Sequence, residues 1–246
     1  MLVQLKNITK IYRSNGQRAL DDVSMNFDKG EIVGLLGVNG SGKTTCSTIL
    51  AGLHKATSGD LLFRGESVLK NIANYRRHVG YCTQSPNLHK DLTIYENLYY
   101  GGLYFGLDHE STKKTVDQTI ELLELSDQLK KFPDMLSGGY KQRAMIARTL
   151  IPNPEFLIFD EPTAGLDPGI RKKLWKILEK LRGMGKSIVL TTHYLDEADF
   201  LCDQICILSE GRIIHQAPKS TLKSQHNNEH LEDIFLKLTT EEQEEK

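Results

Sequence analysis

The pattern of apolar and polar residues divides the chain into three blocks, with changes of character near Gln84 and Pro154. In the first block the apolar runs are short or alternate with polar residues, which is typical of strands. They predict strands at 2–5, 23–27, 31–36, 61–63 and 78–82. The run at 31–36 is apolar enough for a buried strand, and a helix is expected to follow it at 43–53. This block is therefore rich in strands, with one early helix.

The second block, 91–150, has apolar residues at helical spacing, as at Val116, Ile120 and Leu123, so it is predicted to be a helical insertion. The third block alternates again between the two patterns. It predicts strands at 156–159, 187–192 and 205–208 and helices at 169–181 and 195–200. Such alternation favours a parallel sheet. Beyond Pro218 the pattern fades, and the Glu-rich segment 240–246 is interpreted as a solvated tail.

The composition is that of an ordinary globular protein: 246 residues, 39% hydrophobic and 26% charged, long enough for one large domain. The formal net charge of -1 provides no overall field for nucleic acid, so no nucleic-acid partner is expected. No apolar run approaches the roughly 20 residues of a membrane span, and residues 1–6 lack a signal-peptide pattern, so the chain is expected to stay in the cytoplasm. The cysteines show no C-x-x-C spacing and are interpreted as reduced core thiols: Cys46, Cys82, Cys202 and Cys206.

A phosphate-binding loop is predicted between the buried strand at 31–36 and the helix that follows it. Its residues are Gly37, Val38, Asn39, Gly40, Ser41, Gly42, Lys43 and Thr44. The glycines allow backbone N–H groups to surround a phosphate at the positive end of the helix. Lys43 is expected to reach the β- and γ-phosphates, and Thr44 to give a hydroxyl ligand to Mg²⁺ that arrives with the nucleotide. This motif leaves ATP and GTP both open.

Two acids and a histidine follow strands of the same predicted sheet. Asp160 and Glu161 end the apolar run at 156–159, and His193 follows the run at 187–192. Because parallel strands end at a common edge where ligands bind, we expect all three side chains near the phosphates. Asp160 is then a metal ligand, and Glu161 the base that activates water. Alone, these acids would fit a capping pair and His193 a structural histidine.

A second anion site is predicted at Ser137, Gly138 and Gly139, which precede a helical pattern at 141–150. The alternative is a simple helix cap. The segment 136–140 resembles the signature motif of ATP-binding cassette (ABC) ATPases, and it lies upstream of Asp160 and Glu161 as in that family. The resemblance covers roughly residues 2–238. Two positions depart from the family pattern: Tyr140 replaces the usual glutamine, and Val38 stands where proline is frequent.

The resemblance implies an α/β fold: a P-loop NTPase (RecA-like) core with an antiparallel β subdomain and an inserted α-helical subdomain. The implied nucleotide-binding domain spans 1–225, with the helical subdomain at about 85–153, and 226–246 forms a C-terminal helix and acidic tail. Carried over by position, Tyr12 stacks on adenine, Gln84 senses magnesium and the membrane partner, and Asp167 lies in a loop that crosses the dimer. Thr45 joins the nucleotide-binding residues, and Lys43, Gln84, Glu161 and His193 form the catalytic set.

The family also implies partners. Two copies pack head to tail, each signature motif closing over ATP bound by the other copy, and a homodimer is favoured. A separate membrane permease is driven from the cytoplasmic face. The aromatic run 99–105 is expected mainly to pack in the core, with the alternative that part of it faces the permease. The segment 231–238 is similar to the endings of drug, antibiotic, polysaccharide and lipid exporters, although it also fits a terminal amphipathic helix.

Two other classes of function are weighed against an exporter subunit. A soluble ABC ATPase of DNA repair or translation usually needs a long coiled-coil insertion or two cassettes in one chain, with a basic surface. An unrelated phosphate-loop kinase or GTPase has no need for the segment 136–140 or for His193. The sequence favours the ATP-hydrolysing transporter subunit over both.

Overall fold

The computed structural model describes residues 1–13, 16–227 and 229–244. The strands are β1 (Val3–Ile11), β2 (Arg18–Phe27), β3 (Ile32–Leu36), β4 (Ser58–Phe63), β5 (Glu66–Ser67), β6 (Val79–Cys82), β7 (Phe156–Asp160), β8 (Ser187–Thr192), β9 (Gln204–Ser209) and β10 (Arg212–Pro218). The α-helices are α1 (Lys43–Leu50), α2 (Ile72–Arg77), α3 (Ile94–Tyr104), α4 (His109–Leu122), α5 (Gly138–Leu150), α6 (Pro168–Gly183), α7 (Leu195–Leu201), α8 (Lys219–Gln225) and α9 (Leu231–Glu244). Short 3-10 turns occupy Val68–Lys70, Ser126–Gln128 and Pro133–Met135.

The central sheet has the strand order β10-β9-β3-β8-β7-β6. The pairs β9–β3, β3–β8, β8–β7 and β7–β6 are parallel, whereas β10 pairs antiparallel with β9 at the edge. Every residue of β3, β7 and β8 is buried. Strands covered on both faces need continuous apolar runs, which explains the pattern seen in the sequence. The predicted parallel sheet is confirmed.

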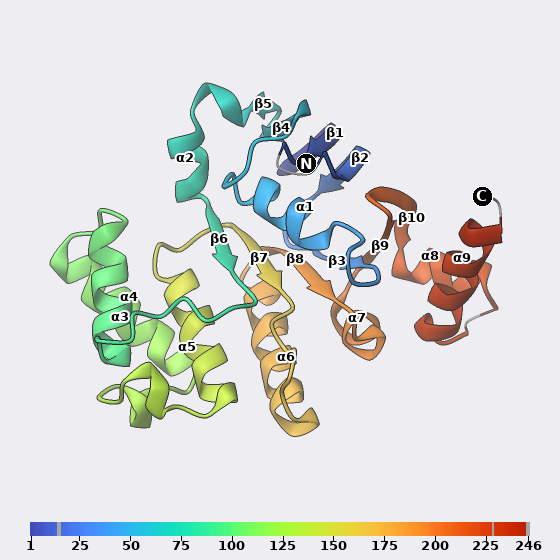
Figure 1. The fold of residues 1–246 in the computed structure, drawn as a ribbon. Helices are drawn as coiled ribbons and strands as arrows, with labels where there is room; N and C mark the ends of the chain where they lie inside the picture. Colours follow the sequence, from blue (N-terminus) through green and yellow to red (C-terminus); the bar gives the residue numbers. More distant parts are fainter. Residues whose placement is uncertain (14–15, 228, 245–246) are drawn as a thin grey trace.

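A second sheet, antiparallel with the order β2-β1-β4-β5, lies above the central sheet in Figure 1. Helix α1 lies between the two sheets, and its Cys46, Ile49 and Leu50 are buried in one core with residues of both. The opposite face of the central sheet packs against α5, α6 and α7 around a second core. This layering places the start of α1 at the carboxyl end of β3, and the predicted α/β fold is confirmed.

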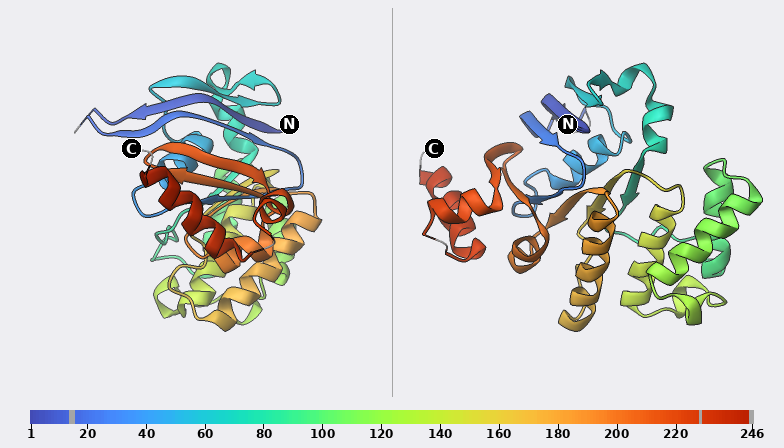
Figure 2. Two further views of the ribbon diagram at one scale, coloured as in Figure 1. Left: turned by 90° about the vertical axis from the view of Figure 1, so that its right-hand side faces the viewer. Right: turned by 180° about the vertical axis from the view of Figure 1, so that it is seen from behind.

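The segment between β6 and β7 is helical, as the periodicity predicts, and its helices α3, α4 and α5 lie together at one side of the molecule, away from α8 and α9 (Figures 1 and 2). Thr93 starts α3 with a capping box: its hydroxyl accepts from Glu96 N, and the Glu96 carboxylate accepts from Thr93 N. Val116, Ile120 and Leu123 are buried, in the same core as α6. The boundaries of a separate subdomain remain a prediction.

The structure corrects several boundaries. Helix α1 ends at Leu50 rather than Leu53, because a turn follows in which Gly52 has a φ of 67°. Helix α2 and strand β10 were not predicted; α2 has 6 residues, too few to show a period, and β10 is a half-buried edge strand. The interpretation of 240–246 as a tail without structure is wrong for 240–244, since α9 continues to Glu244. Residues 245–246 lie outside the described part.

The predicted reduced thiols are confirmed, because Cys46, Cys82, Cys202 and Cys206 are all buried and free. Within the described residues, no helix combines the length and apolar character needed to cross a membrane.

Candidate functional site

The loop between β3 and α1 has the tight geometry of a phosphate-binding loop. A Cβ at Gly37 would lie 2.3 Å from Leu208 O, and one at Gly42 would lie 2.6 Å from Ala19 O. Gly42, at the N-cap of α1, also has a φ of 109°, which L side chains rarely adopt. Only glycine fits at these two positions, so the backbone can curl over the first turn of the helix.

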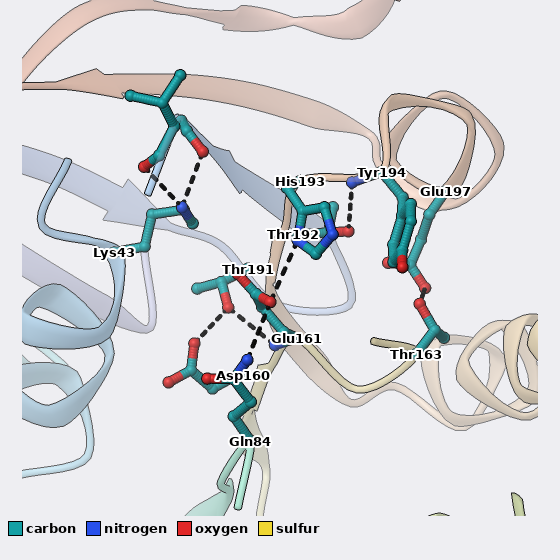
Figure 3. A network of polar contacts seen from close by, with 12 residues as sticks. Lys43, Gln84, Asp160, Glu161, Thr163, Thr191, Thr192, His193, Tyr194 and Glu197 are labelled. Carbon is teal, nitrogen blue, oxygen red and sulfur yellow. Dashed lines mark hydrogen bonds and ion pairs between the residues drawn. The ribbon is translucent and has the colours of Figure 1, made fainter. Parts of the chain in front are cut away.

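Lys43, the first residue of α1, lies under this loop. Its side chain is 6% exposed, and Nζ donates to Gly37 O at 2.8 Å and to Val38 O at 3.0 Å (Figure 3). Burial lowers the pKa of Lys43, while the charges of Glu161 and Asp160 oppose this effect. A buried ammonium group that is held by neutral carbonyls alone favours an anion as its next neighbour.

A cavity of about 670 Å³ opens beside the loop. The predicted site residues that line it are Tyr12, Asn39, Gly40, Gly42, Lys43, Thr44, Thr45, Gln84, Glu161 and His193. The lining residues that the sequence did not suggest are Gln17, Ala19, Ala164, Gly165 and Tyr194. Gly37, Val38, Ser41 and Asp160 are not part of the lining. The structure thus brings most of the predicted residues of the loop and of the sheet edge to one cavity.

Asp160 ends β7 and is 2% exposed. Its Oδ1 accepts from Thr191 Oγ1 at 2.5 Å, and its Oδ2 accepts from Tyr81 OH at 3.1 Å. The two hydroxyls fix the carboxylate on both sides and leave each oxygen a further lone pair. The sequence did not predict that Tyr81 and Thr191 bind Asp160. Tyrosine and threonine are common in strands, where their side chains usually serve packing.

Glu161 has an unusual backbone, with a φ of 49° that is uncommon for a residue other than glycine. Glu161 N donates to Thr191 O and to Thr191 Oγ1, which holds this conformation. The side chain is contacted at one oxygen, Oε2, by Gln84 Nε2 at 3.2 Å and by His193 Nδ1 at 3.2 Å (Figure 3). Three loops that follow β6, β7 and β8 therefore meet at one carboxylate, as expected from strand ends at one sheet edge.

Tyr12 follows β1 and also lines the cavity. Its hydroxyl lies 3.2 Å from Thr45 Oγ1, and Lys10 Nζ lies 5.3 Å from the centre of its ring. Its ring is within the same cavity as the loop, but its stacking on adenine remains a prediction.

The second predicted anion site is not brought to this cavity. Ser137 and Gly138 are exposed at the start of α5, and Ser137 makes no side-chain cap to the helix. Gly139 is buried, and a Cβ there would lie 2.7 Å from Ile170 Cγ2. Asp167, at the N-cap of α6, is exposed and also makes no side-chain cap. The starts of α5 and α6 thus lie outside the cavity. Neither Ser137 nor Asp167 caps the first N–H groups of its helix, and such groups can bind an anion.

An ATPase of the ABC type combines these features: a phosphate-binding loop before α1, the acids Asp160 and Glu161 at the end of β7, a histidine after β8, and a second exposed helix start at α5. The family model for ABC transporters matches residues 20–164, and the chain belongs to this family. It is an ATP-binding subunit of a transporter and an ABC-type ATPase, so the expected family and activity are confirmed, and the choice between ATP and GTP is settled as ATP.

Among known proteins, the chain is similar to Nod factor export ATP-binding protein I of Burkholderia thailandensis, with 39% identity over 87% of this chain and 70% of the relative. It is also similar to a solved ATP-binding subunit of an ABC transporter, with a TM-score of 0.86, 29% identity and coverage of 97% of this chain and 100% of the other. A dimeric ATP-binding cassette in a post-hydrolysis state with ADP and Pi matches with a TM-score of 0.81, 31% identity and coverage of 88% and 98%.

Proposed function

We propose that this ATPase drives export through a separate membrane permease, with two copies of the chain closing over ATP. The observation that carries the proposal is that the signature residues Ser137 and Gly138 are exposed and lie outside the cavity lined by Lys43 and Glu161. One chain therefore holds both halves of a nucleotide site but does not assemble them. Two copies in a symmetric head-to-tail dimer complete two such sites.

The dimeric form is supported by the similar cassette that is dimeric with ADP and Pi. In the proposed arrangement the amides at the start of α5 cover the phosphates that the partner's loop binds, because a helix N-terminus attracts anions. Asp167, exposed beside that surface, is assigned to the loop that crosses the dimer.

Mg²⁺ fits the residues present at the end of β7. Asp160 is a carboxylate fixed by two hydroxyls, and Thr44 and Gln84 line the cavity with further oxygen donors. Within the described residues, no group of three or more His, Cys, Asp or Glu side chains suits a metal ion by itself. This donor set is typical of a Mg²⁺ ion that enters with nucleotide phosphates and neutralises their charge.

The remaining steps are assigned to side chains of this chain. Lys43 leaves the carbonyls of Gly37 and Val38 and binds the β- and γ-phosphates. Glu161 orients the attacking water and takes its proton, and His193 positions both the carboxylate and the γ-phosphate. Hydrolysis reopens the dimer, and the permease changes its access state in response.

The docking surface for the permease is proposed on α3. Tyr104 is 87% exposed, Tyr100 51% and Phe105 44%, so the expectation that the aromatic run packs mainly in the core is wrong for these three residues. Tyr104 and Phe105 border a groove of about 200 Å³ that also includes Asn87, in the loop that follows Gln84. Exposed aromatic residues beside a groove are typical of an interaction site.

Co-purification with the permease tests this surface. The double variant Tyr104→Ser and Phe105→Ser is expected to keep its fold, because both side chains are exposed, and to lose at least about tenfold in the yield of complex. The matched control is Phe200→Ser on α7, an aromatic residue that is 52% exposed on another surface and is expected to leave the complex intact. Equal yields for the double variant and wild type would remove α3 from the docking surface.

Export, rather than import, is favoured by the relatives named as export proteins and by α9, the helix that the exporter-like ending forms. A position on the cytoplasmic face of the membrane follows from the proposed permease contact. The alternative of a soluble ABC ATPase is less well supported, because the longest helix in the described residues, α6, has 16 residues and offers no long coiled coil. Co-sedimentation with membranes that depends on the permease would separate the two functions.

A further inference from the structure

Glu197 is a buried acid in α7, four residues after His193, that the proposed mechanism does not use. Its side chain is 0% exposed. A carboxyl group in such a position is costly unless neighbouring groups hydrogen-bond to it. The hydrogen-bond partners of Glu197 therefore indicate its role.

Two donors reach the same oxygen of Glu197. Oε1 accepts from Thr163 Oγ1 at 2.9 Å and from Trp175 Nε1 at 2.9 Å. Thr163 is itself 0% exposed and lies two residues after Glu161, while Trp175 belongs to α6. Figure 3 shows the bond from Thr163 to one side of the group formed by Gln84, Glu161 and His193. Glu197 is thereby attached to the loop that carries the proposed base.

Glu197 is also part of the segment that carries His193. It belongs to α7, which begins at Leu195, two residues after His193, so the bond from Thr163 joins the loop after β7 to the segment after β8. Burial raises the pKa of Glu197, and the hydrogen bonds from Thr163 and Trp175 are among the interactions that oppose this effect. The other oxygen, Oε2, has no partner of good hydrogen-bond geometry. The carboxyl thus lies between the two catalytic loops.

The geometry points to Glu197 as a positioning residue for ATP hydrolysis, which sets the contact between Glu161 and His193 by joining the segments that carry them. This inference depends on the roles proposed for those two residues. The loop has particular need of such support because Glu161 has a φ of 49°, and conformations of this kind persist only where the surroundings hold them. A displacement of about 1 Å at a catalytic group is enough to slow a reaction strongly.

Trp175 allows positioning to be separated from packing. Its bond to Glu197 comes from α6, which carries no catalytic side chain, whereas the bond from Thr163 comes from the catalytic loop. Trp175→Phe removes one donor and keeps most of the ring, and Thr163→Val removes the other donor with little change of shape. A purely structural role for Glu197 would make the two changes equivalent.

The test measures kcat and KM for ATP in four variants: Glu197→Ala, Glu197→Gln, Thr163→Val and Trp175→Phe. Glu197→Ala and Thr163→Val are expected to lower kcat about tenfold while KM stays within about twofold, because the site still binds ATP with its base misplaced. Glu197→Gln retains a carbonyl acceptor and is expected to restore most of kcat. Trp175→Phe is expected to keep kcat within about twofold of wild type.

Folding is checked by circular dichroism and, in the variants that retain it, by the emission of Trp175, the sole tryptophan, which is 7% exposed. If Glu197→Ala does not fold, Thr163→Val decides. A wild-type kcat in Thr163→Val, an equal loss in Trp175→Phe, or no recovery in Glu197→Gln would overturn the inference. Glu161→Gln in the same assay keeps the questions apart: normal hydrolysis by that variant would refute the proposed base itself, whatever Glu197 does.

Discussion

His193 Nδ1 lies 3.2 Å from Glu161 Oε2, and this contact joins the loops that follow two neighbouring strands of the central sheet, β8 and β7. The same oxygen accepts a hydrogen bond from Gln84 Nε2, also at 3.2 Å. In this arrangement the oxygen that would accept a proton from water is already engaged on two sides. Gln84 and His193 thus orient Glu161, and in the proposed mechanism one of these contacts has to lengthen, or Oε1 has to act, when water is activated.

Replacing Glu161 by glutamine removes the proton acceptor and keeps the shape of the side chain. We expect ATP hydrolysis to fall by about 10²-fold or more, while ATP binding persists and the protein becomes a stable dimer with ATP and Mg²⁺. Phosphate release and size-exclusion chromatography measure the two effects. Glu179→Gln, at an exposed position of α6, is the control. Normal turnover by Glu161→Gln would show that another group is the base.

His193→Ala removes one of the two groups that orient Glu161. The expected result is a kcat lower by about 10²-fold with a smaller change in KM, since Lys43 and the loop amides still bind the phosphates. Steady-state kinetics measure both constants, with His54→Ala, an exposed histidine away from the site, as the comparison. A large rise in KM at unchanged kcat would instead assign His193 to nucleotide binding alone.

Lys43→Ala tests the phosphate cradle itself. The variant loses a buried cation that now donates to Gly37 O and Val38 O, so we expect the Kd for ATP to rise roughly 10- to 100-fold and hydrolysis to fall with it. Titration with a fluorescent ATP analogue measures the Kd. Lys176→Ala, exposed on α6, should bind as wild type. Unchanged affinity in Lys43→Ala would contradict the proposed binding mode.

The sequence predicted the strand ends well because the chemistry there is local. The apolar runs of β7 and β8 lead directly into Glu161 and His193, the run of β3 leads into the loop that precedes Lys43, and parallel strands bring their carboxyl ends to one edge. The contacts among Gln84, Glu161 and His193 follow from that topology.

Partners that lie within strands or helices were beyond sequence reasoning. Tyr81 and Thr191 donate hydrogen bonds to Asp160 from within β6 and β8. At such positions tyrosine and threonine are usually explained by packing alone. Glu197 looks like a polar residue of a surface helix until the structure shows it buried against Thr163 and Trp175. The exposure of Tyr104 was also missed, because clustered aromatic residues usually pack inside and only the arrangement of α3 decides otherwise.

An ion pair attaches the antiparallel sheet to the central one. Arg64, just after β4, binds both oxygens of Glu155, just before β7, at 2.6 and 2.8 Å, and His78 Nδ1 lies 2.7 Å from the same carboxylate. Burial by itself raises the pKa of Glu155, but the hydrogen bonds and charges of Arg64 and His78 outweigh it and hold the pKa below 4.5. A depressed acid pKa gives stability that is present above pH 4.5 and is lost as the pH falls through the folded-state value.

Arg64→Met keeps an apolar stem and removes the guanidinium group, which binds Glu155 and whose Cζ lies 4.8 Å from the centre of the Phe63 ring. Because Arg64 is half exposed, we expect a loss of only about 0.5 to 1 kcal/mol in the free energy of unfolding at pH 7. The loss should shrink as the pH falls through the folded-state pKa of Glu155, which lies below 4.5, because the protonated carboxyl no longer pairs with a cation. Urea unfolding of both proteins at pH 7 and at the lowest pH where they remain folded measures this difference. An equal difference at both pH values would mean that Arg64 acts by packing rather than through the charge of Glu155.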